Sequence, residues 1–345
     1  MDQRSDRTLN GPISRASAAD VAREAGVSVS AVSRAFTPGA SISARMRNRV
    51  LAAAEKLDYV PNAMARSLMT QRTHLVGVIL SNFSNPIYLT VLGYFTRMLQ
   101  QRGLRMLLLN VSPDDDLEAA ANMIMQYGID ALVVSAGAVS PLITDKCIKR
   151  NIPLVAFARS PRGSRLHVVC ADNVAGGRIA ARQLIDAGHR NFGMIAGPRA
   201  ASTSADRMKG FQAELQEAGL DLGPVEFTEA YTYEHGLDAA RRLFKAPELP
   251  TALFCANDTL AFGALDHVRH ERHLSVPDDL SIIGFDDINL AAAKAYDLST
   301  VRQPMEEMVA EAVNIVERNV LSEQVKWEKR LFSCTYVQRA TVGRV

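Results

Sequence analysis

The chain of 345 residues is too long to fold around one hydrophobic core, so its length indicates two or three domains. The formal net charge is only +2, but residues 1–72 carry eleven Lys and Arg against six Asp and Glu, a net of +5, and the remainder carries −3. Residues 1–14 lack the apolar segment of a signal peptide, and no later apolar run reaches membrane-spanning length. Composition therefore argues against a secreted or membrane protein. It predicts a cytoplasmic protein with a disordered arm at residues 1–14.

Two short helices separated by a sharp break follow this arm. Ser17 is placed to cap the first helix, with Asp20 closing a capping box, and Gly26 ends it. Ser28 is placed to cap the second helix, in which Val32 turns inward. The pattern predicts a helix-turn-helix.

The second helix leaves Val29, Ser30, Ser33 and Arg34 facing outward. In a DNA-binding helix-turn-helix this helix lies in the major groove, where Arg34 would bind guanine and Val29 would contact a thymine methyl group. Amphipathic helix pairs also occur in proteins that do not bind DNA, so the pattern alone leaves both interpretations open. The basic charge of the same segment favours DNA.

A third helix begins after Ser43, and Val50, Ala54 and Leu57 repeat in it at helical spacing. The run D-V-A-x-x-A-G-V-S-x-x-x-V-S-R, followed by Y-x-P-N-x-x-A-R-x-L from Tyr59, resembles the headpiece and hinge of the lactose/galactose repressor (LacI/GalR) family. The resemblance implies a headpiece at residues 15–60 and a hinge helix and linker at residues 61–73.

The resemblance implies a transcription repressor that would bind a palindromic operator as a homodimer. Its hinge helix has only about two turns and is too short to be stable alone, so we expect it to fold on DNA. Leu68 would wedge into the minor groove, with ordinary dimer packing as the alternative. The expected DNA-contacting residues are Ser17, Asp20, Ser28, Val29, Ser30, Ala31, Ser33, Arg34, Arg47, Tyr59, Asn62, Ala65, Arg66 and Leu68.

From His74 onward, short apolar strands alternate with amphipathic helices, which is typical of doubly wound parallel sheets. Strands are expected at residues 75–80, 105–111, 131–136, 153–158, 167–172, 191–196, 225–230, 251–256 and 280–285. Helices are expected at residues 88–101, 117–127, 141–150, 175–187, 205–218, 233–245, 259–270 and 305–321. Nine strands are too many for one lobe and predict two α/β lobes.

The resemblance implies the two-lobed fold of periplasmic sugar-binding proteins, with chain crossovers near Cys170, near Thr300 and near the C-terminus. A closing strand at residues 331–339 would end near the second lobe. We therefore expect an effector-binding and dimerisation domain at residues 74–345. Its first lobe would span about 74–170 and 303–330, and its second about 171–300 and 331–345. No heptad segment follows, which predicts a dimer without a tetramer-forming tail.

Polar residues follow several expected strands, where open α/β sheets bind ligands. By resemblance, Arg207, Asn257 and Asp286 would bind hydroxyls or carboxylates of a small effector. Tyr231 would stack on it, with packing as the alternative. The expected effector-binding residues are Asn82, Tyr88, Ser135, Arg159, Thr203, Arg207, Tyr231, Asn257 and Asp286. For four further residues, capping of the next helix is the favoured interpretation: Asp172, Asn173, Asp258 and Asp287.

One departure from the family bears on the effector. Ala158 stands where the family often has Asp, directly before Arg159. With Arg159 and Arg207 both in the cleft and this carboxylate missing, we hypothesise a sugar acid rather than a neutral sugar. The resemblance identifies neither the effector nor whether it releases or tightens operator binding.

No catalytic or cofactor motif is present. The sequence lacks G-x-S-x-G, a Walker phosphate loop and H-E-x-x-H, and its four cysteines form no C-x-x-C pair, which predicts buried reduced thiols and no metal or cofactor. Gly176 and Gly177 are better explained by close helix packing than by anion binding. An enzyme is therefore not expected. A secreted sugar-binding protein of a transporter is the alternative function, but it would have a signal peptide and no basic headpiece.

Overall fold

The computed structural model describes residues 16–37, 39–61, 67, 72–81, 85–111, 116–135, 141–159, 166–320 and 327–345. The chain divides into two compact units, Met1–Thr73 and His74–Val345. Within the described ranges, no helix combines the length and hydrophobicity needed to cross a membrane.

Three helices of the first unit lie within described residues: α1 (Ala18–Ala25), α2 (Val29–Ala35) and α3 (Ala44–Lys56). We call these three helices and the turns between them the headpiece. Each begins after a serine whose hydroxyl accepts a hydrogen bond from the third backbone N–H of the helix, and these serines are Ser17, Ser28 and Ser43. The apolar helix faces meet in a small core that contains the fully buried Val21 and Val50. The three helices expected from the sequence are confirmed.

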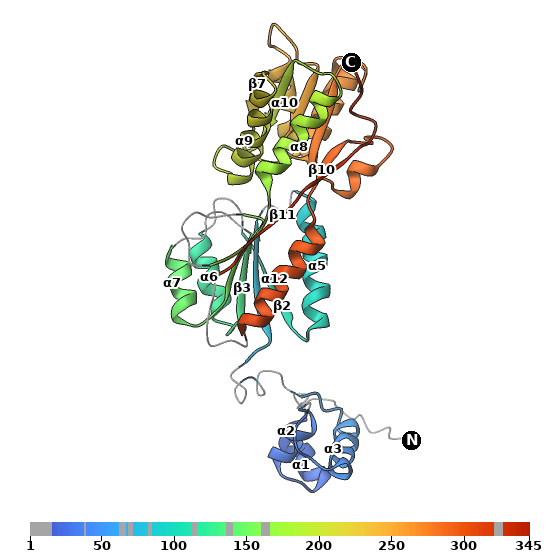
Figure 1. The fold of residues 1–345 in the computed structure, drawn as a ribbon. Helices are drawn as coiled ribbons and strands as arrows, with labels where there is room; N and C mark the ends of the chain where they lie inside the picture. Colours follow the sequence, from blue (N-terminus) through green and yellow to red (C-terminus); the bar gives the residue numbers. More distant parts are fainter. Residues whose placement is uncertain are drawn as a thin grey trace, which may run out of the picture. The chain divides into compact units, whose positions relative to one another are not determined.

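The first lobe of the second unit is a parallel sheet with strand order β11-β5-β4-β3-β1-β2. Its strands are β1 (Leu75–Ser81), β2 (Arg105–Val111), β3 (Ala131–Ser135), β4 (Leu154–Phe157), β5 (His167–Ala171) and β11 (Lys329–Phe332). Helices α5 (Ile87–Gln101) and α12 (Met305–Val320) cover one face, and α6 (Leu117–Met125) and α7 (Pro141–Lys149) cover the other (Figure 1). Because both faces are covered, β3 is buried along its whole length.

The second lobe is a sheet with strand order β12-β10-β9-β8-β6-β7, parallel except where β12 pairs with β10. Its strands are β6 (Phe192–Ala196), β7 (Leu222–Phe227), β8 (Ala252–Cys255), β9 (Ser281–Asp286), β10 (Thr300–Arg302) and β12 (Thr335–Val337). Its helices are α8 (Asn173–Asp186), α9 (Ser202–Glu217), α10 (Tyr233–Leu243), α11 (Asp258–Asp266), the π-helix η1 (His267–Glu271) and the 3-10 helix η2 (Asn289–Ala292).

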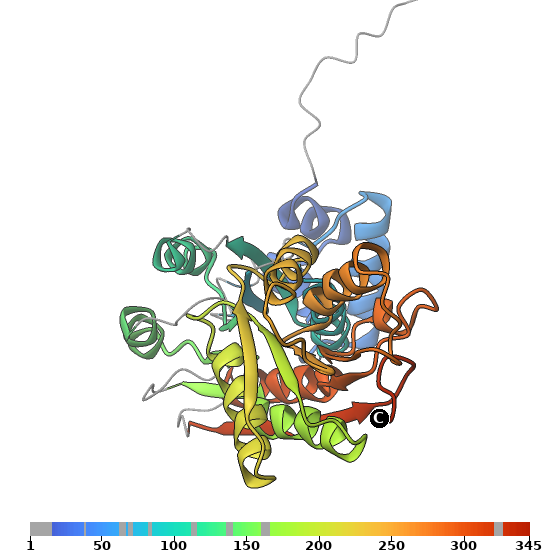
Figure 2. The ribbon, with the colours of Figure 1, turned by 90° about the horizontal axis from the view of Figure 1, so that it is seen from above.

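Helices α8 and α9 lie side by side and almost touch through their backbones (Figures 1 and 2). A Cβ atom on Gly177 would lie 2.1 Å from the carbonyl oxygen of Arg207, and one on Gly210 would lie 1.9 Å from that of Val174. Only glycine permits this approach. The packing role predicted for Gly177 is confirmed, and the same contact fixes the position of Arg207 on α9.

Three segments connect the lobes: β5 to α8, β10 to α12, and β11 to β12. They lie near the three expected crossovers. The closing strand expected at 331–339 is wrong as one strand, because β11 completes the first sheet and β12 the second. The backbone N–H of Asp172 donates to the carbonyl of Phe332 at 2.8 Å, so two of the crossovers are hydrogen-bonded to each other.

All nine expected strands are present, and all but β2 have at least one shifted end. The largest shift is in β7, which begins at Leu222 rather than at residue 225. Sequence reasoning missed β10, since three residues are too few to show a strand pattern. It also extended α11 through the π-helix η1 and began α9 three residues late, at residue 205 rather than Ser202.

Candidate functional site

The break between α1 and α2 is a tight turn centred on Gly26. Gly26 has φ +60° and donates its N–H to the carbonyls of Ala22 and Arg23, which ends α1. At the other end of α1, Ser17 and Asp20 form the expected capping box, and the hydrogen bonds from Ser17 lower the pKa of Asp20. Both predicted DNA-contacting residues therefore already serve to fix the start of α1.

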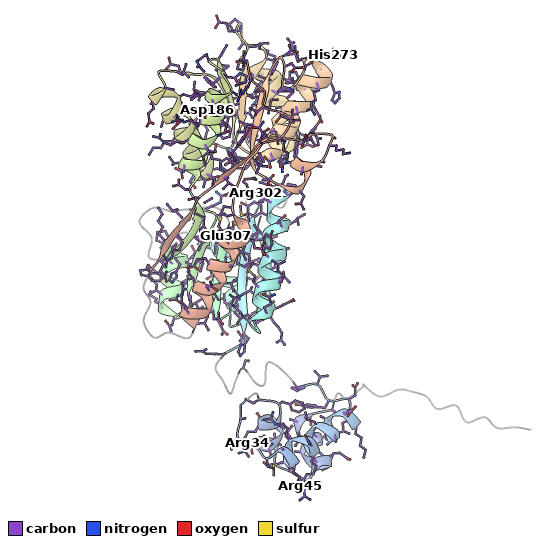
Figure 3. All side chains as sticks on the ribbon, turned by 45° about the vertical axis from the view of Figure 1, so that its right-hand side comes forward. Arg34, Arg45, Asp186, His273, Arg302 and Glu307 are labelled. Atoms are coloured by element: carbon purple, nitrogen blue, oxygen red, sulfur yellow. The ribbon has the colours of Figure 1, made fainter. Side chains whose placement is uncertain are left out.

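The outward face of α2 is accessible. Val29 is 50% exposed, and Ser30 and Arg34 are exposed beside it. Arg34 Nε donates to the carbonyl of Ser30 at 3.3 Å, which orients the guanidinium along the helix, and the hydroxyls of Ser28 and Ser30 lie 2.9 Å apart. Figure 3 shows Arg34 and Arg45 at the periphery of the headpiece. This face has the side chains that base recognition requires.

Ala31, another predicted DNA contact, is buried within the headpiece. Ala31 is only 3% exposed, because α2 begins at Val29 and Ala31 then lies on the same face as Val32 and Ala35. That face packs against α1 and α3.

Two other predicted DNA contacts are partly engaged within the headpiece. Arg47 donates to the carbonyl of Ala40 at 3.5 Å, and the ring of Tyr59 lies 5.9 Å from that of Phe36. Arg49, which was not among the predicted contacts, donates to the carbonyl of Gly26 at 3.0 Å and ties α3 to the turn. Ser33 accepts at its carbonyl a hydrogen bond from the Thr37 hydroxyl. Five residues predicted to contact DNA or the effector lie outside the described residues: Asn62, Ala65, Arg66, Leu68 and Asn82.

A cavity of about 40 Å³ lies between the two lobes. Seven of the expected effector-binding residues line it: Tyr88, Arg159, Thr203, Arg207, Tyr231, Asn257 and Asp286. The remaining lining residues are Asn85, Ile87, Val91, Phe157, Ala158, Gln303 and Met305. The expected residues converge because several of them follow the carboxyl ends of parallel strands. Figure 3 labels Arg302, at the end of β10, and Glu307, near the start of α12, on either side of the neighbouring crossover.

Arg207 is the most connected side chain of the cavity. It is 5% exposed, its Nε donates to Asn173 Oδ1 at 2.8 Å, and its Nη1 donates to the carbonyl of Ala256 at 2.6 Å. Its Nη2 lies 3.4 Å from Asp286 Oδ1, and the guanidinium lies 3.7 Å from the centre of the Phe285 ring. These contacts hold the guanidinium in one orientation at the cavity wall.

Asp286 joins the two lobes. Its carboxylate accepts hydrogen bonds from Gln303 Nε2 at 2.6 Å and from Asn85 Nδ2 at 3.3 Å, besides pairing with Arg207. Burial raises the pKa of Asp286, and the Arg207 guanidinium partly opposes that shift. Asp286 also has φ +118°, which only strong surrounding contacts maintain in a residue with a side chain.

Among the residues that the structure describes, two donors at the cavity have no hydrogen-bond partner. Arg159 Nε and Asn257 Nδ2 are buried without a hydrogen bond, although Asn257 Oδ1 accepts the N–H of Leu260 and caps α11. The other polar pair is satisfied, since the hydroxyls of Thr203 and Tyr231 lie 3.3 Å apart. Burial raises the pKa of Tyr231, which keeps it protonated.

Ser135 is fully buried at the end of β3 and is not among the residues that line the cavity, and its role in effector binding stays a prediction. Two polar lining residues, Asn85 and Gln303, were not predicted. Gln303 follows β10, the strand that was itself too short to recognise. Asn85 follows β1, and its position after a strand was the available signal.

The predicted helix caps are right for one residue of four. Asp172 Oδ1 accepts the N–H of Ala175 and caps α8. Asn173 instead accepts from Arg207, and Asp258 accepts from the Thr300 hydroxyl at 2.5 Å and the N–H of Ile288 at 2.9 Å. Asp287 accepts from Arg302 Nε and from Arg339 Nη2, each at 2.6 Å.

Comparison with known proteins matches both units. The family model described as "Bacterial regulatory proteins, lacI family" matches residues 18–62, and that described as "Periplasmic binding protein-like domain" matches residues 181–342. Catabolite control protein A of Priestia megaterium is 31% identical over 309 residues, covering 89% of this chain and 93% of the relative. The ribose operon repressor of Escherichia coli strain K12 is 29% identical over 332 residues, covering 93% of this chain and 98% of the relative.

A solved structure has the same fold along nearly the whole chain. The lac repressor dimer bound to operator and the anti-inducer ONPF superposes with a TM-score of 0.86 at 22% identity, covering 96% of this chain and 100% of that one. A helix-turn-helix headpiece joined to a two-lobed domain defines a DNA-binding transcription regulator, not an enzyme. The chain belongs to the LacI family of bacterial regulatory proteins. A transporter-associated binding protein, the alternative from the sequence, is thereby set aside.

Proposed function

We propose that this protein is a repressor that binds a palindromic operator as a homodimer, and that a small effector, a sugar or a sugar acid, controls its operator affinity. The observation that carries the effector assignment is the pair of buried donors at the cavity, Arg159 Nε and Asn257 Nδ2. Buried polar atoms normally have hydrogen-bond partners, so two unpaired donors at one cavity fit a bound molecule. The names of the relatives, a ribose operon repressor and a catabolite control protein, support a role in transcription control.

On the DNA side, α2 would lie in the major groove with Val29, Ser30 and Arg34 at the base edges. Arg45 and Arg47 of α3 would contact phosphates. The predicted hinge helix within residues 61–73 would place Leu68 in the minor groove of a dimer-bound operator. The similar solved structure, a dimer on operator DNA, supports this arrangement. Acting on DNA, the protein would work in the cytoplasm.

The size of the cavity couples ligand binding to lobe movement. About 40 Å³ holds only a few water molecules, so a sugar enters only when the lobes change their separation. Such a change would shift the two first lobes of a dimer relative to each other. Because the headpieces are connected to these lobes, the distance between the two headpieces would change as well. Through this coupling the effector can either lower or raise operator affinity, and titration on operator DNA measures which change occurs.

The experiment begins with selection of binding sites from random DNA by the full chain. Selected sites are expected to be palindromic, with each half-site read by one headpiece. Gel-shift titration then measures operator affinity with a panel of pentoses, hexoses and their acids, and at least one member should change it. Recovery of only non-palindromic sites would refute the dimer, and an unchanged affinity across the panel would refute effector control.

A further inference from the structure

Three charged side chains line the cavity among the residues that the structure describes: Arg159, Arg207 and Asp286. Their formal charges leave one positive charge in excess. The cavity is otherwise walled by apolar and neutral polar groups, including Ile87 and Phe157. An excess charge in such a setting is costly unless an opposite charge accompanies it.

The excess does not lie on Arg207. Its Nε, Nη1 and Nη2 contact Asn173, the carbonyl of Ala256 and Asp286, and its face lies on the Phe285 ring. Arg207 and Asp286 therefore neutralise each other within the protein.

The excess charge belongs to Arg159. Its Nε is buried and without a hydrogen-bond partner, and among the described residues no carboxylate forms an ion pair with it. The nearest acidic group of the cavity, Asp286, is already shared among Arg207, Gln303 and Asn85. Arg159 is thus a partly exposed cation at the cavity wall that has no carboxylate partner of its own among the described residues.

The backbone before Arg159 supports a binding role. Ala158 has φ +58°, a conformation that costs a residue with a Cβ atom about 1–2 kcal/mol. Such conformations cluster at ligand sites, where the surrounding structure maintains them. Both Ala158 and Arg159 line the cavity. The strained turn therefore places Arg159 at the ligand position.

We propose that the effector is a hydroxylated monocarboxylate, a sugar acid, whose carboxylate pairs with Arg159 while one of its oxygens accepts a hydrogen bond from Asn257 Nδ2. The assignment rests on the proposed function and names the chemical class of its effector. One carboxylate supplies the single negative charge that the cavity lacks, and a planar guanidinium matches a carboxylate in geometry. Asn257 is 1% exposed, so its free amide donor has no access to bulk water.

The test uses the full chain and matched pairs of probes. Isothermal titration compares D-glucose with D-glucuronate and D-gluconate, D-galactose with D-galacturonate, and D-ribose with D-ribonate, and includes D-glucose 6-phosphate. At least one acid is expected to bind at least tenfold more tightly than its neutral counterpart. Arg159→Gln should weaken binding of that acid about 10- to 100-fold. Arg159→Lys should weaken its binding less, because Lys keeps the positive charge but loses the planar, two-pronged geometry of the guanidinium.

The matched control is Arg105→Gln, at an exposed position at the start of β2, which should leave acid binding unchanged. Thermal unfolding shows whether each variant is folded. Binding of neutral sugars in preference to every acid, tighter binding of the sugar phosphate than of any acid, or equal loss in the Arg105 control overturns the proposal. If neutral sugars change operator affinity, the proposed function stands while the sugar-acid assignment falls. If no probe binds, both fall.

Discussion

Asn85 Nδ2, two residues before α5 in the first lobe, donates a hydrogen bond to Asp286 Oδ2, at the end of β9 in the second lobe, at 3.3 Å. Both side chains are buried, so this contact across the lobes is shielded from water. Asn85 Oδ1 meanwhile accepts the N–H of Ile87 in the first turn of α5. A ligand that changes the separation of the lobes must therefore break or reshape a bond anchored in α5.

Asn85→Asp tests this contact. Aspartate preserves the acceptor for Ile87 but removes the amide donor and places a second carboxylate beside Asp286. We expect the thermal midpoint of unfolding to fall, with a cost of about 1–3 kcal/mol, and the radius of gyration by small-angle scattering to rise. An unchanged midpoint and radius would show that the contact does not hold the lobes together.

Arg207 is expected to affect stability as well as ligand response. Arg207→Ala leaves Asp286 buried without its cation and should lower the free energy of unfolding by about 3–5 kcal/mol. Arg207→Lys keeps the charge but loses the hydrogen bonds of the fork, so a smaller loss is expected. Urea denaturation measures both variants. Equal free energies of unfolding for the two variants would show that the positive charge at position 207 does not stabilise buried Asp286.

Asp258 predicts a pH dependence. Burial raises its pKa well above the ordinary value of 3.8, and the neighbouring Asp286 raises it further. A carboxyl with a raised folded-state pKa stabilises the fold below pH 3.8, and this contribution is lost as the pH rises through the folded-state pKa. Asp258→Asn keeps a partner for both Thr300 and Ile288 but does not ionise.

We therefore expect Asp258→Asn to unfold at a higher temperature than the natural chain at pH 8, with the difference shrinking as the pH falls toward 4. Calorimetry across that range measures it. A constant difference at every pH would assign the effect to packing rather than to the charge of Asp258.

Arg34→Ala should relax base preference at one position in each half-site, at a cost of about 1–3 kcal/mol for the preferred base. Arg45→Ala, at the exposed start of α3, should instead weaken all sequences alike, as expected for a phosphate contact. Gel shifts with a set of single-base operator variants distinguish them. An equal loss of affinity for every operator variant in Arg34→Ala would indicate that Arg34 contacts phosphates rather than a base.

The cavity was largely predictable from the sequence, because parallel strands bring their carboxyl ends together and polar residues after them meet there. Ser135 is the buried last residue of β3 and is not among the residues that line the cavity. Gln303 was missed with its three-residue strand, which is formed by pairing with distant segments and not by a local pattern. Ala31 lies on the buried face of α2 with Val32 and Ala35, which a resemblance between sequences does not reveal.

The partners of polar residues next to helix starts also could not be predicted from the sequence. Asn257 and Asp258 are adjacent and chemically similar, yet Asn257 caps α11 while Asp258 bonds to Ile288 and Thr300. Local propensity favours a cap at either residue, and only the positions of β10 and of the loop after β9 distinguish them. The sequence predicts the type of residue at this edge of the sheet, while tertiary packing assigns the partners.

The division of the closing segment into β11 and β12 has a practical consequence. Each sheet contains a strand that arrives from elsewhere in the chain, so neither lobe corresponds to one uninterrupted stretch of gene. A fragment ending after β5 would leave the first sheet without β11, and one beginning at α8 would carry β11 with no sheet to join. Isolating either lobe for study would require splicing several pieces, and a single proteolytic cut in one crossover would leave the lobes tethered by the other two.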